Sequence, residues 1–358
     1  MDEWISNDIN SGGTAEFVFC PVCFYIQAFL LERRVCMKKI LAAILALSLS
    51  LSGCQSMAHD KPVVSVAQLV SHPSLNLIRD NFKKEMKRLG YVDGKNIELN
   101  YADASGQVAN LNSIVNQFED KQSDVIVAIA TPTAQMAARV SKNIPVVFSA
   151  VSDPIGAQLV SNLKHPGGNI TGTSDEVQID QILELAKTLM PNMKTVGFLY
   201  NASETNSVAN LKKAKSYCAS HGLTLIEGTG KDITELETSA SVLCQKVDVL
   251  LSPNDNTVAS AMPSLSKTAT DAGIPYYVGA DSMVKDGGLA TVGIDYAQLG
   301  KETADMVDQI LKGKKAGDIP VKVYKKDLFI YVNKKTLKQL GITLPDSVAQ
   351  NKKLQIVG

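Results

Sequence analysis

Residues 124–150 read DVIVAIATPTAQMAARVSKNIPVVFSA, and their pattern indicates the fold class. It holds an apolar run rich in β-branched residues at 124–130, a polar loop, a segment with helical spacing at 133–141, and a second apolar run at 144–150. Short strands separated by helices are typical of a parallel sheet with crossover helices. Because both runs are nearly continuous rather than alternating, both faces of the sheet are expected to be covered.

The same pattern occurs twice in the chain. Three segments of the first half match three of the second, at offsets of 132, 124 and 130 residues. The matching pairs begin at Val64 and Val196, at Asp124 and Asp248, and at Ile144 and Ile274. Repeats in register indicate repeated structural units. The fold class predicted is therefore α/β, with two similar Rossmann-like lobes of parallel sheet joined by a hinge and a ligand cleft between them.

The rest of the chain continues the alternation of strand and helix. Strands are expected at 63–70, 96–101, 124–130, 144–150, 195–200, 223–227, 248–252 and 274–280. Helices are expected at 75–89, 107–119, 133–141, 206–220, 234–245 and 257–271. Residues 289–312 and 320–341 follow as returns of the chain to each lobe. The predicted lobes are 63–174 with 296–318, and 175–295 with 319–358, with crossings near 173–177, 293–297 and 314–322.

Composition narrows the function classes. A chain of 358 residues is long enough for about two domains with real cores, and 45% apolar residues exclude intrinsic disorder. Lys and Arg number 36, and Asp and Glu also number 36, so no basic surface for nucleic acid is expected. After Cys54 the sequence has two Cys residues, Cys218 and Cys244, and both lie in segments with helical spacing of apolar residues. We interpret them as packing residues, with a mutual disulfide as the alternative.

The N-terminal region has the pattern of an export signal. From Met37, two lysines precede an apolar stretch, 40–51, that is too short for a comfortable membrane span. The tetrapeptide Leu51-Ser52-Gly53-Cys54 resembles a bacterial lipobox, which implies cleavage before Cys54 and acylation of its thiol, for example with palmitate. An ordinary export signal or an uncleaved anchor are the alternatives. We interpret 1–36 as a non-native extension, 37–53 as the signal peptide and 54–62 as a tether, and we expect an anchored protein at the cell envelope, facing the periplasm or the exterior.

The candidate site lies where strands lead into helices. In open parallel sheets, ligands bind beyond the carboxyl ends of the strands. Six loops occupy such positions, three in each predicted lobe, and all are rich in hydroxyl, amide and carboxylate groups. Their candidate ligand-binding residues are Ser71, His72, Thr131, Pro132, Thr133, Ser149, Ala150, Tyr200, Ser203, Glu204, Asn206, Asn254, Asp255 and Asp281. Loops from two facing lobes would form a polar cleft that closes by a hinge.

Four longer motifs carry a resemblance to a known family. They are FSAVSDPIGAQLV at 148–160, HPGGNITGTSD at 165–175, SPNDNTVAS at 252–260 and GGLATVGIDYAQLG at 287–300. With the lipobox and the paired lobes, their order resembles a substrate-binding protein of an ABC importer, closest to the tryptophan/tyrosine-type branch of the type I periplasmic-binding fold. The resemblance covers nearly all of 61–345. It implies uptake of a small solute, an amino acid with a large apolar side chain, and an ABC permease and ATPase as partners.

The candidate residues suit a zwitterion. A carboxylate favours a helix N-terminus, and Thr131-Pro132-Thr133 offers one with hydroxyls on either side. An ammonium needs carboxylate or carbonyl acceptors, for which Asp255 and Asp281 are candidates. Capping of the adjacent helices is the alternative for all four side chains. Glu204 and Asn206 are expected at the rim, His72 either at the ligand or in a solvated turn, and Tyr200 as a stacking wall.

Enzyme signatures are missing from the sequence. It contains no G-x-S-x-G, no H-E-x-x-H, no Walker A loop and no spaced His/Cys cluster. We therefore predict a binding protein rather than an enzyme, without cofactor or metal, acting as a monomer on a small-molecule ligand and without nucleic acid. A ligand sensor feeding a membrane receptor and a lipid-anchored α/β enzyme are the rival hypotheses.

Overall fold

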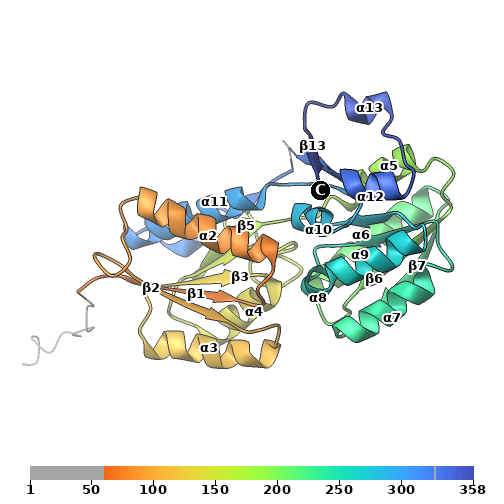
Figure 1. The fold of residues 1–358 in the computed structure, drawn as a ribbon. Coiled ribbons are helices and arrows are strands. Elements are labelled where there is room, and N and C mark those ends of the chain that lie inside the picture. Colours follow the sequence, from red (N-terminus) through yellow and green to blue (C-terminus); the bar gives the residue numbers. More distant parts are fainter. Residues whose placement is uncertain (1–59, 326–327) are drawn as a thin grey trace, which may run out of the picture. The chain divides into compact units, whose positions relative to one another are not determined.

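Two mostly parallel sheets carry the fold in a computed structural model that describes residues 60–325 and 328–358 (Figure 1). The first sheet has the order β11-β5-β4-β3-β1-β2 and the second has the order β13-β12-β10-β9-β8-β6-β7. Only β12, which runs antiparallel to β10, and its parallel neighbour β13 depart from the common strand direction among the pairings described. The predicted extension, signal peptide and Cys54 lie outside the described residues.

The strands of the first sheet are short and mostly buried. They are β1 (Val63–Gln68), β2 (Glu98–Asp103), β3 (Val125–Ile129), β4 (Val146–Ser149), β5 (Ile170–Ser174) and β11 (Lys322–Val323). The helices α2 (Pro73–Arg88) and α11 (Tyr296–Leu311) cover one face, and α3 (Val108–Asp120) and α4 (Thr131–Val140) cover the other. Every residue of β1, β3, β4 and β5 is buried, as expected for strands covered on both faces.

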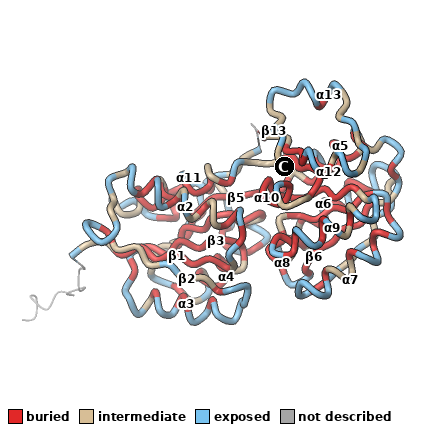
Figure 2. Tube along the Cα trace, viewed as in Figure 1, coloured by how far each residue is buried: buried red, intermediate tan, exposed pale blue. Residues whose placement is uncertain are grey.

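The second sheet repeats this plan and adds an antiparallel edge. Its strands are β6 (Thr195–Tyr200), β7 (Thr224–Thr229), β8 (Val249–Ser252), β9 (Tyr276–Val278), β10 (Ala290–Gly293), β12 (Phe329–Asn333) and β13 (Leu354–Val357). Its helices are α5 (Ile179–Leu189), α6 (Thr205–Ser220), α7 (Ile233–Leu243), α8 (Asn256–Ser260), α9 (Met262–Asp271), α10 (Asp281–Lys285), α12 (Lys334–Gln339) and α13 (Asp346–Ala349). A 3₁₀ turn, η1 (Ala316–Asp318), precedes β11. Figure 2 shows the buried strands at the centre of each sheet and exposed helix faces outside them.

The repeated aspartates perform the same structural task in both lobes. Asp124 accepts a hydrogen bond from the backbone N–H of Val63 at 2.7 Å, and Asp248 accepts one from that of Thr195 at 2.8 Å. The repeated prolines also correspond, because the N–H groups of Ile126 and Leu250 each donate to the carbonyl of the matching proline at 2.9 Å. The internal repeat predicted from sequence is therefore confirmed at the level of individual hydrogen bonds.

Several predicted boundaries differ from the structure. The helix expected over 257–271 is two helices, α8 and α9, because Pro263 sits in the first turn of α9 and has no N–H to continue the preceding helix. The sequence also did not resolve β5 and α5 as separate elements. Finally, β11 pairs with β5, so the first sheet extends past residue 318, where we had placed its end. The third crossing therefore follows Val323.

The alternative of a Cys218–Cys244 disulfide is wrong. Both thiols are free and buried. Cys218 packs with Val249 and Leu251, whereas Cys244 packs in the cluster that contains Leu250. Since side chains alternate along a strand, the two thiols lie on opposite faces of the second sheet. Burial also raises the pKa of the Cys218 thiol to about 11, as expected for a packing residue.

Helices α2 and α11 lie side by side over the first sheet, although more than two hundred residues separate them along the chain (Figure 1). Their close approach depends on Gly300. A Cβ at this position would lie 2.3 Å from the carbonyl oxygen of Ile78 and 2.9 Å from the backbone nitrogen of Phe82. Both atoms belong to the backbone of α2 and cannot move away by rotating a side chain, so the helices meet only with glycine here.

Gly300→Ala is therefore expected to lower the free energy of unfolding by about 1–3 kcal/mol, because overpacking outweighs the gain in helix propensity. Urea unfolding followed by circular dichroism measures this. Lys301→Ala, at the next and exposed position of α11, is the control and is expected to change stability by less than about 0.5 kcal/mol. A Gly300→Ala protein as stable as the parent would show that α2 and α11 are not held at this distance.

Candidate functional site

A small cavity lies where strand ends of both sheets lead into helices. Its volume is about 20 Å³, which holds little more than one water molecule. Both lobes contribute to its walls, as do the first crossing and α11. The lining residues are His72, Ser74, Leu75, Ala130, Thr131, Ala150, Ser152, Asp175, Asn206, Asn254, Asn256, Ala259, Ala280, Met283 and Tyr296. We call this cavity the chamber.

The chamber is closed by hydrogen bonds between the lobes. The hydroxyl oxygen of Ser152 accepts a hydrogen bond from the amide nitrogen of Asn254 at 2.8 Å. The hydroxyls of Ser74 and Ser282 also form a hydrogen bond, and His72 contacts Asn256 at 3.4 Å. The structure thus has its two lobes in contact around the chamber.

A larger cleft of about 1020 Å³ lies outside the chamber. Pro132, Ser203 and Glu204 line it, and Asn256 lines both spaces. Gln135 of α4 accepts a hydrogen bond from Thr205 of α6 at 3.5 Å across this cleft. The cleft and the chamber are therefore neighbours that share Asn256.

Of the fourteen predicted ligand residues, five line the chamber: His72, Thr131, Ala150, Asn206 and Asn254. The candidates that line neither space are Ser71, Thr133, Ser149, Tyr200, Asp255 and Asp281. The chamber therefore brings together residues of several predicted loops, whereas other predicted residues of the same loops do not face it.

Two of the chamber's residues are held in an unfavourable backbone conformation. Ala130 has φ 81° and Ala150 has φ 57°, the left-handed region that non-glycine residues seldom occupy. They follow β3 and β4 directly. Such residues cluster at ligand sites, where the surrounding structure compensates for the strain. Ser105 and Gln158, which line the larger cleft, also have a positive φ, so strained backbone marks the walls of both spaces.

His72 ends the loop after β1 and is buried at the start of α2. Burial lowers the pKa of its imidazole to about 4, so the ring is neutral near pH 7. The hypothesis of a solvated turn residue is therefore wrong for His72, whose side chain is 7% exposed. Its ring contributes a neutral donor and a neutral acceptor to the chamber wall.

Glu204 and Asp255 form a buried acidic pair around the start of α8. Asp255 accepts from the N–H groups of Thr257 and Val258 at 3.0 Å, from the N–H of Asn201 at 2.8 Å and from the hydroxyl of Ser207 at 2.6 Å. Both of its oxygens are thus occupied, so the geometry places Asp255 in the helix-capping role that the sequence had left as an alternative.

Glu204 completes this capping arrangement. It accepts from the backbone N–H of Asn256 at 3.1 Å, from that of Thr257 at 3.2 Å and from the side chains of Asn206 and Asn256 at 3.2 and 2.7 Å. Burial, and then the charge of Asp255, raises the pKa of Glu204 to about 8. Burial raises the pKa of Asp255 as well.

Asp281 and Tyr200 have partners away from the chamber. One oxygen of Asp281 binds the ammonium of Lys285 at 2.6 Å within α10, and the other has no hydrogen-bond partner. The hydroxyl of Tyr200 donates to Glu227 at 3.0 Å, and burial together with that carboxylate raises the pKa of Tyr200 to about 12. The geometry gives Tyr200 a structural role in the second sheet.

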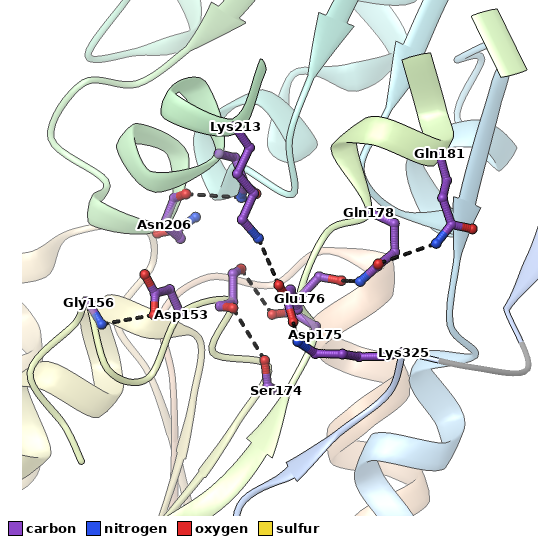
Figure 3. Close-up of polar contacts among 12 residues, drawn as sticks. Asp153, Gly156, Ser174, Asp175, Glu176, Gln178, Gln181, Asn206, Lys213 and Lys325 are labelled. Carbon is purple, nitrogen blue, oxygen red and sulfur yellow. Dashed lines mark hydrogen bonds and ion pairs between the residues drawn. The ribbon is translucent and has the colours of Figure 1, made fainter. Parts of the chain in front are cut away.

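Asp175 is the carboxylate that the sequence analysis did not select. It follows β5 at the first crossing and lines the chamber (Figure 3). Tyr296 donates to it at 2.9 Å, Ser152 at 3.1 Å, and the amide of Asn254 also donates to it. Burial raises its pKa. Two features of the sequence could have identified Asp175 as a site residue: it ends the motif at 165–175, and it directly follows a strand.

The neighbouring Glu176 holds two other segments together. It binds Lys213 of α6 at 3.0 Å and Lys325 of the third crossing at 3.3 Å (Figure 3). Two adjacent acids at the first crossing therefore have separate tasks. Asp175 faces the chamber, and Glu176 pairs with cations outside it.

Residues 60–325 and 328–358, the part of the chain that the structure describes, contain neither a metal-binding cluster nor a membrane-spanning helix. No three His, Cys, Asp or Glu side chains in this part of the chain are grouped so that they could hold a metal ion. None of its helices has the length and apolar character needed to cross a bilayer.

The fold and the chamber define a class of protein, and comparisons with known proteins agree with it. Two lobes of mostly parallel sheet form a type I periplasmic-binding fold. The family described as ABC transporter substrate binding protein matches residues 63–355, and the chain belongs to this family. Substrate-binding proteins of ABC transporters are extracytoplasmic solute binders.

Relatives show which solutes similar proteins bind. The tyrosine-binding protein of Clostridioides difficile strain R20291 is 39% identical over 279 residues, covering 78% of this chain and 81% of that protein. A structure from Streptococcus pneumonia, an ABC domain in complex with L-Trp, is 38% identical with a TM-score of 0.80, covering 83% of this chain and 100% of that chain.

A third relative helps to define the conformation. The ligand-free, open structure of a substrate-binding protein with adhesive properties from Clostridium difficile is 39% identical, with a TM-score of 0.64, and covers 83% of this chain and 99% of that chain. At nearly equal identity, the structure described here is more similar to the L-Trp complex than to the open form. This agrees with the hydrogen bonds that close the chamber.

The buried His72 predicts a pH dependence of stability. Burial lowers the pKa of its imidazole from 6.5 to about 4. Between these two pH values, His72 therefore binds a proton in the unfolded chain but not in the folded chain. The contribution of the neutral ring to the free energy of unfolding is complete above about pH 6.5 and is lost as the pH falls towards 4. The free-energy difference between the parent and His72→Gln is expected to fall by about 2 kcal/mol from pH 7 to pH 5.

Urea unfolding of both proteins at the two pH values measures this difference. The parent and the variant must be compared with each other at each pH. The raised pKa of Glu204 increases the free energy of unfolding of both proteins as the pH falls from about 8 to 4.5, which is opposite to the effect of His72. His165→Gln, at an exposed position, is the control. Equal stability differences at pH 5 and pH 7 would show that the folded protein accepts a proton on His72 as readily as the unfolded chain.

Proposed function

We propose that this protein binds an aromatic L-amino acid and delivers it to an ABC importer, and that a lipid on Cys54 anchors it to the membrane. The observation that carries the ligand proposal is a closed chamber with one carboxylate, Asp175, and a helix start, at Thr131, on its walls. A zwitterion needs both groups. Relatives that bind tyrosine and L-Trp support an aromatic side chain.

Asp175 holds the ammonium of the ligand in this proposal. Its present donors are a phenol, a hydroxyl and an amide, all of them neutral groups. Burial raises the pKa of Asp175, and a cationic partner would favour its charged form. Charge-assisted hydrogen bonds are shorter and stronger than neutral ones, so an ammonium would be a better partner than the amide of Asn254.

The start of α4 holds the carboxylate of the ligand. Thr131 lines the chamber, Pro132 sits in the first turn, and the free N–H groups of that turn favour an anion. Thr133 belongs to the same turn but does not face the chamber. Of the residues predicted to bind the carboxylate of the ligand, Thr131 is therefore the one that contacts the ligand in this proposal.

Binding requires the lobes to separate and close again. A chamber of about 20 Å³ cannot contain an amino acid, so in this proposal the ligand enters an open form and the lobes close around it to a chamber larger than the one described here. Three chain crossings, at 175–178, at 294–295 and after Val323, connect the lobes and form the hinge in this proposal. A ligand that contacts both lobes favours the closed form by its higher affinity for that form.

Asp175→Asn is expected to weaken the binding of phenylalanine, tyrosine and tryptophan alike, by about ten- to a hundredfold, because each loses a charge-assisted hydrogen bond. Calorimetry on protein freed of co-purified ligand by unfolding and refolding measures the affinities. Asp281→Asn is the matched control, since this buried carboxylate lies outside the chamber. If none of the three amino acids, nor leucine, binds the parent, the ligand class is wrong. If only Asp281→Asn weakens binding, the ammonium lies there instead.

The anchor proposal has its own test. Replacing Cys54 with Ser in the full chain removes the thiol to be acylated, so the protein is expected in the soluble envelope fraction or uncleaved. Cell fractionation and mass spectrometry of the N-terminus measure this. Cys218→Ser, which alters a buried packing thiol, is the control. A cleaved Cys54→Ser protein that still required detergent for extraction would exclude the lipid anchor.

A further inference from the structure

The four motifs singled out in the sequence each supply one residue to the surroundings of a single carboxyl group. These residues are Ser152 of 148–160, Asp175 of 165–175, Asn254 of 252–260 and Tyr296 of 287–300. Tyr296 donates a hydrogen bond to Asp175 at 2.9 Å, Ser152 donates one at 3.1 Å, and the amide of Asn254 is also hydrogen-bonded to it. Three side chains from distant segments therefore converge on Asp175.

Asp175 and Tyr296 both lie at the proposed hinge. Asp175 directly follows β5 and begins the first crossing, and Tyr296 is the first residue of α11, directly after the second crossing. Their hydrogen bond therefore joins two of the three chain connections between the lobes. Asn254 adds a contact from the loop after β8 in the second lobe, and Ser152 adds one from the loop after β4 in the first.

The side chain of Tyr296 is only 3% exposed and lines the chamber. A buried tyrosine hydroxyl usually finds a hydrogen-bond partner, and here the partner is Oδ2 of Asp175. The same oxygen contacts the amide of Asn254, whereas Oδ1 contacts the hydroxyl of Ser152. The carboxyl group is thus held between the start of α11 and the second lobe, which sets the orientation that it presents to the chamber.

The phenol also acts on the charge of the carboxyl group. Burial raises the pKa of Asp175, and the hydrogen bond from Tyr296 is the largest of the effects that lower it again. A donor to the charged form of a carboxyl group favours that form. An ammonium also binds the charged form, so the hydroxyl of Tyr296 and a cationic ligand group favour the same state of Asp175.

We propose that Tyr296 is a positioning residue for ligand binding, whose hydroxyl holds the carboxylate of Asp175 in place for the ammonium of the ligand. Tyr296 acts through Asp175 and supplies no charge of its own. This inference rests on the proposed function, in which Asp175 binds the ammonium, and adds the residue on which that contact depends.

Tyr296→Phe keeps the buried ring and removes the hydroxyl. It is expected to weaken the binding of phenylalanine, tyrosine and tryptophan by about three- to tenfold at pH 7. Affinity for an ammonium is lost as the pH falls through the pKa of Asp175 in the ligand-free protein. Because the variant raises that pKa further, the loss is expected to begin about half a pH unit or more higher than in the parent. Calorimetry on ligand-free protein from about pH 4 to pH 8 measures both effects.

Other titratable groups near this bond are the same in the parent and the variant, so the comparison between the two proteins isolates the hydroxyl. They are His72 of α2 on the same wall, Asp281 of α10, Glu204 and Asp255 at the start of α8, and Glu176 with its partners Lys213 and Lys325.

Tyr91→Phe is the matched control. The hydroxyl of Tyr91 also donates to a carboxylate, that of Asp308 in α11, at 3.0 Å, but Tyr91 does not line the chamber. This variant is expected to leave both the affinity and its pH dependence unchanged. In an Asp175→Asn background, Tyr296→Phe is expected to weaken binding further by less than about threefold, because its partner has already lost the charge.

A second replacement guards against misfolding of the phenylalanine variant. A tyrosine fluorinated next to its hydroxyl, incorporated at position 296, keeps the ring and the hydroxyl, and its more acidic O–H is a stronger donor. The loss of affinity is then expected to begin at a lower pH than in the parent. An unchanged or higher pH would overturn the role of Tyr296.

The outcomes separate this inference from the function on which it rests. If no aromatic amino acid binds the parent, the proposed function fails, and this inference fails with it. If the parent binds and Tyr296→Phe has the same affinity and pH dependence, the function stands and the inference is overturned. A loss of affinity by one constant factor at every pH would show that Tyr296 has only a structural role, and it too overturns the inference.

Discussion

A buried acid needs hydrogen-bond partners for its oxygens, and Glu204, whose pKa burial raises to about 8, has partners that organise the site. It accepts from the backbone at the start of α8 and from the side-chain amides of Asn206 and Asn256. Each bond fixes the orientation of its donor. The side chain of Asn256 also contacts His72, which belongs to the other lobe, at 3.4 Å. One acid in the second lobe is thus connected through Asn256 to a residue of the first lobe that lines the chamber.

Asp255 makes this arrangement possible. It lies beside Glu204. One of its oxygens accepts hydrogen bonds from the first N–H groups of α8, and the other accepts from Asn201 in the loop after β6 and from Ser207. Because both acids are buried, each raises the energy of the other's charge, and the cluster of N–H and O–H donors offsets part of this cost. The loops after β6 and β8 are therefore joined through a shared set of hydrogen bonds, which explains why polar residues dominate both.

Much of the fold could be predicted because it depends on local patterns. Continuous apolar runs gave the strands, and the repeated Asp and Pro gave the correspondence of the lobes, which the bonds of Asp124 and Asp248 confirm. The site was harder. Asp175, Asp255 and Asp281 all follow strands, so the sequence makes them look equivalent. Their difference lies in which donors surround them. Asp175 and Asp255 have donors from distant segments, Tyr296 from α11 and Asn201 from the loop after β6, whereas Asp281 binds Lys285 of its own helix α10.

The positions of Cys218 and Cys244 have a consequence for how the protein matures. A sheet lies between the two thiols, so they cannot be oxidised to each other while the second lobe is folded. In an oxidising compartment, the only period of risk is the time between export and folding. The second lobe therefore owes its folded stability to packing and not to a disulfide between these two thiols.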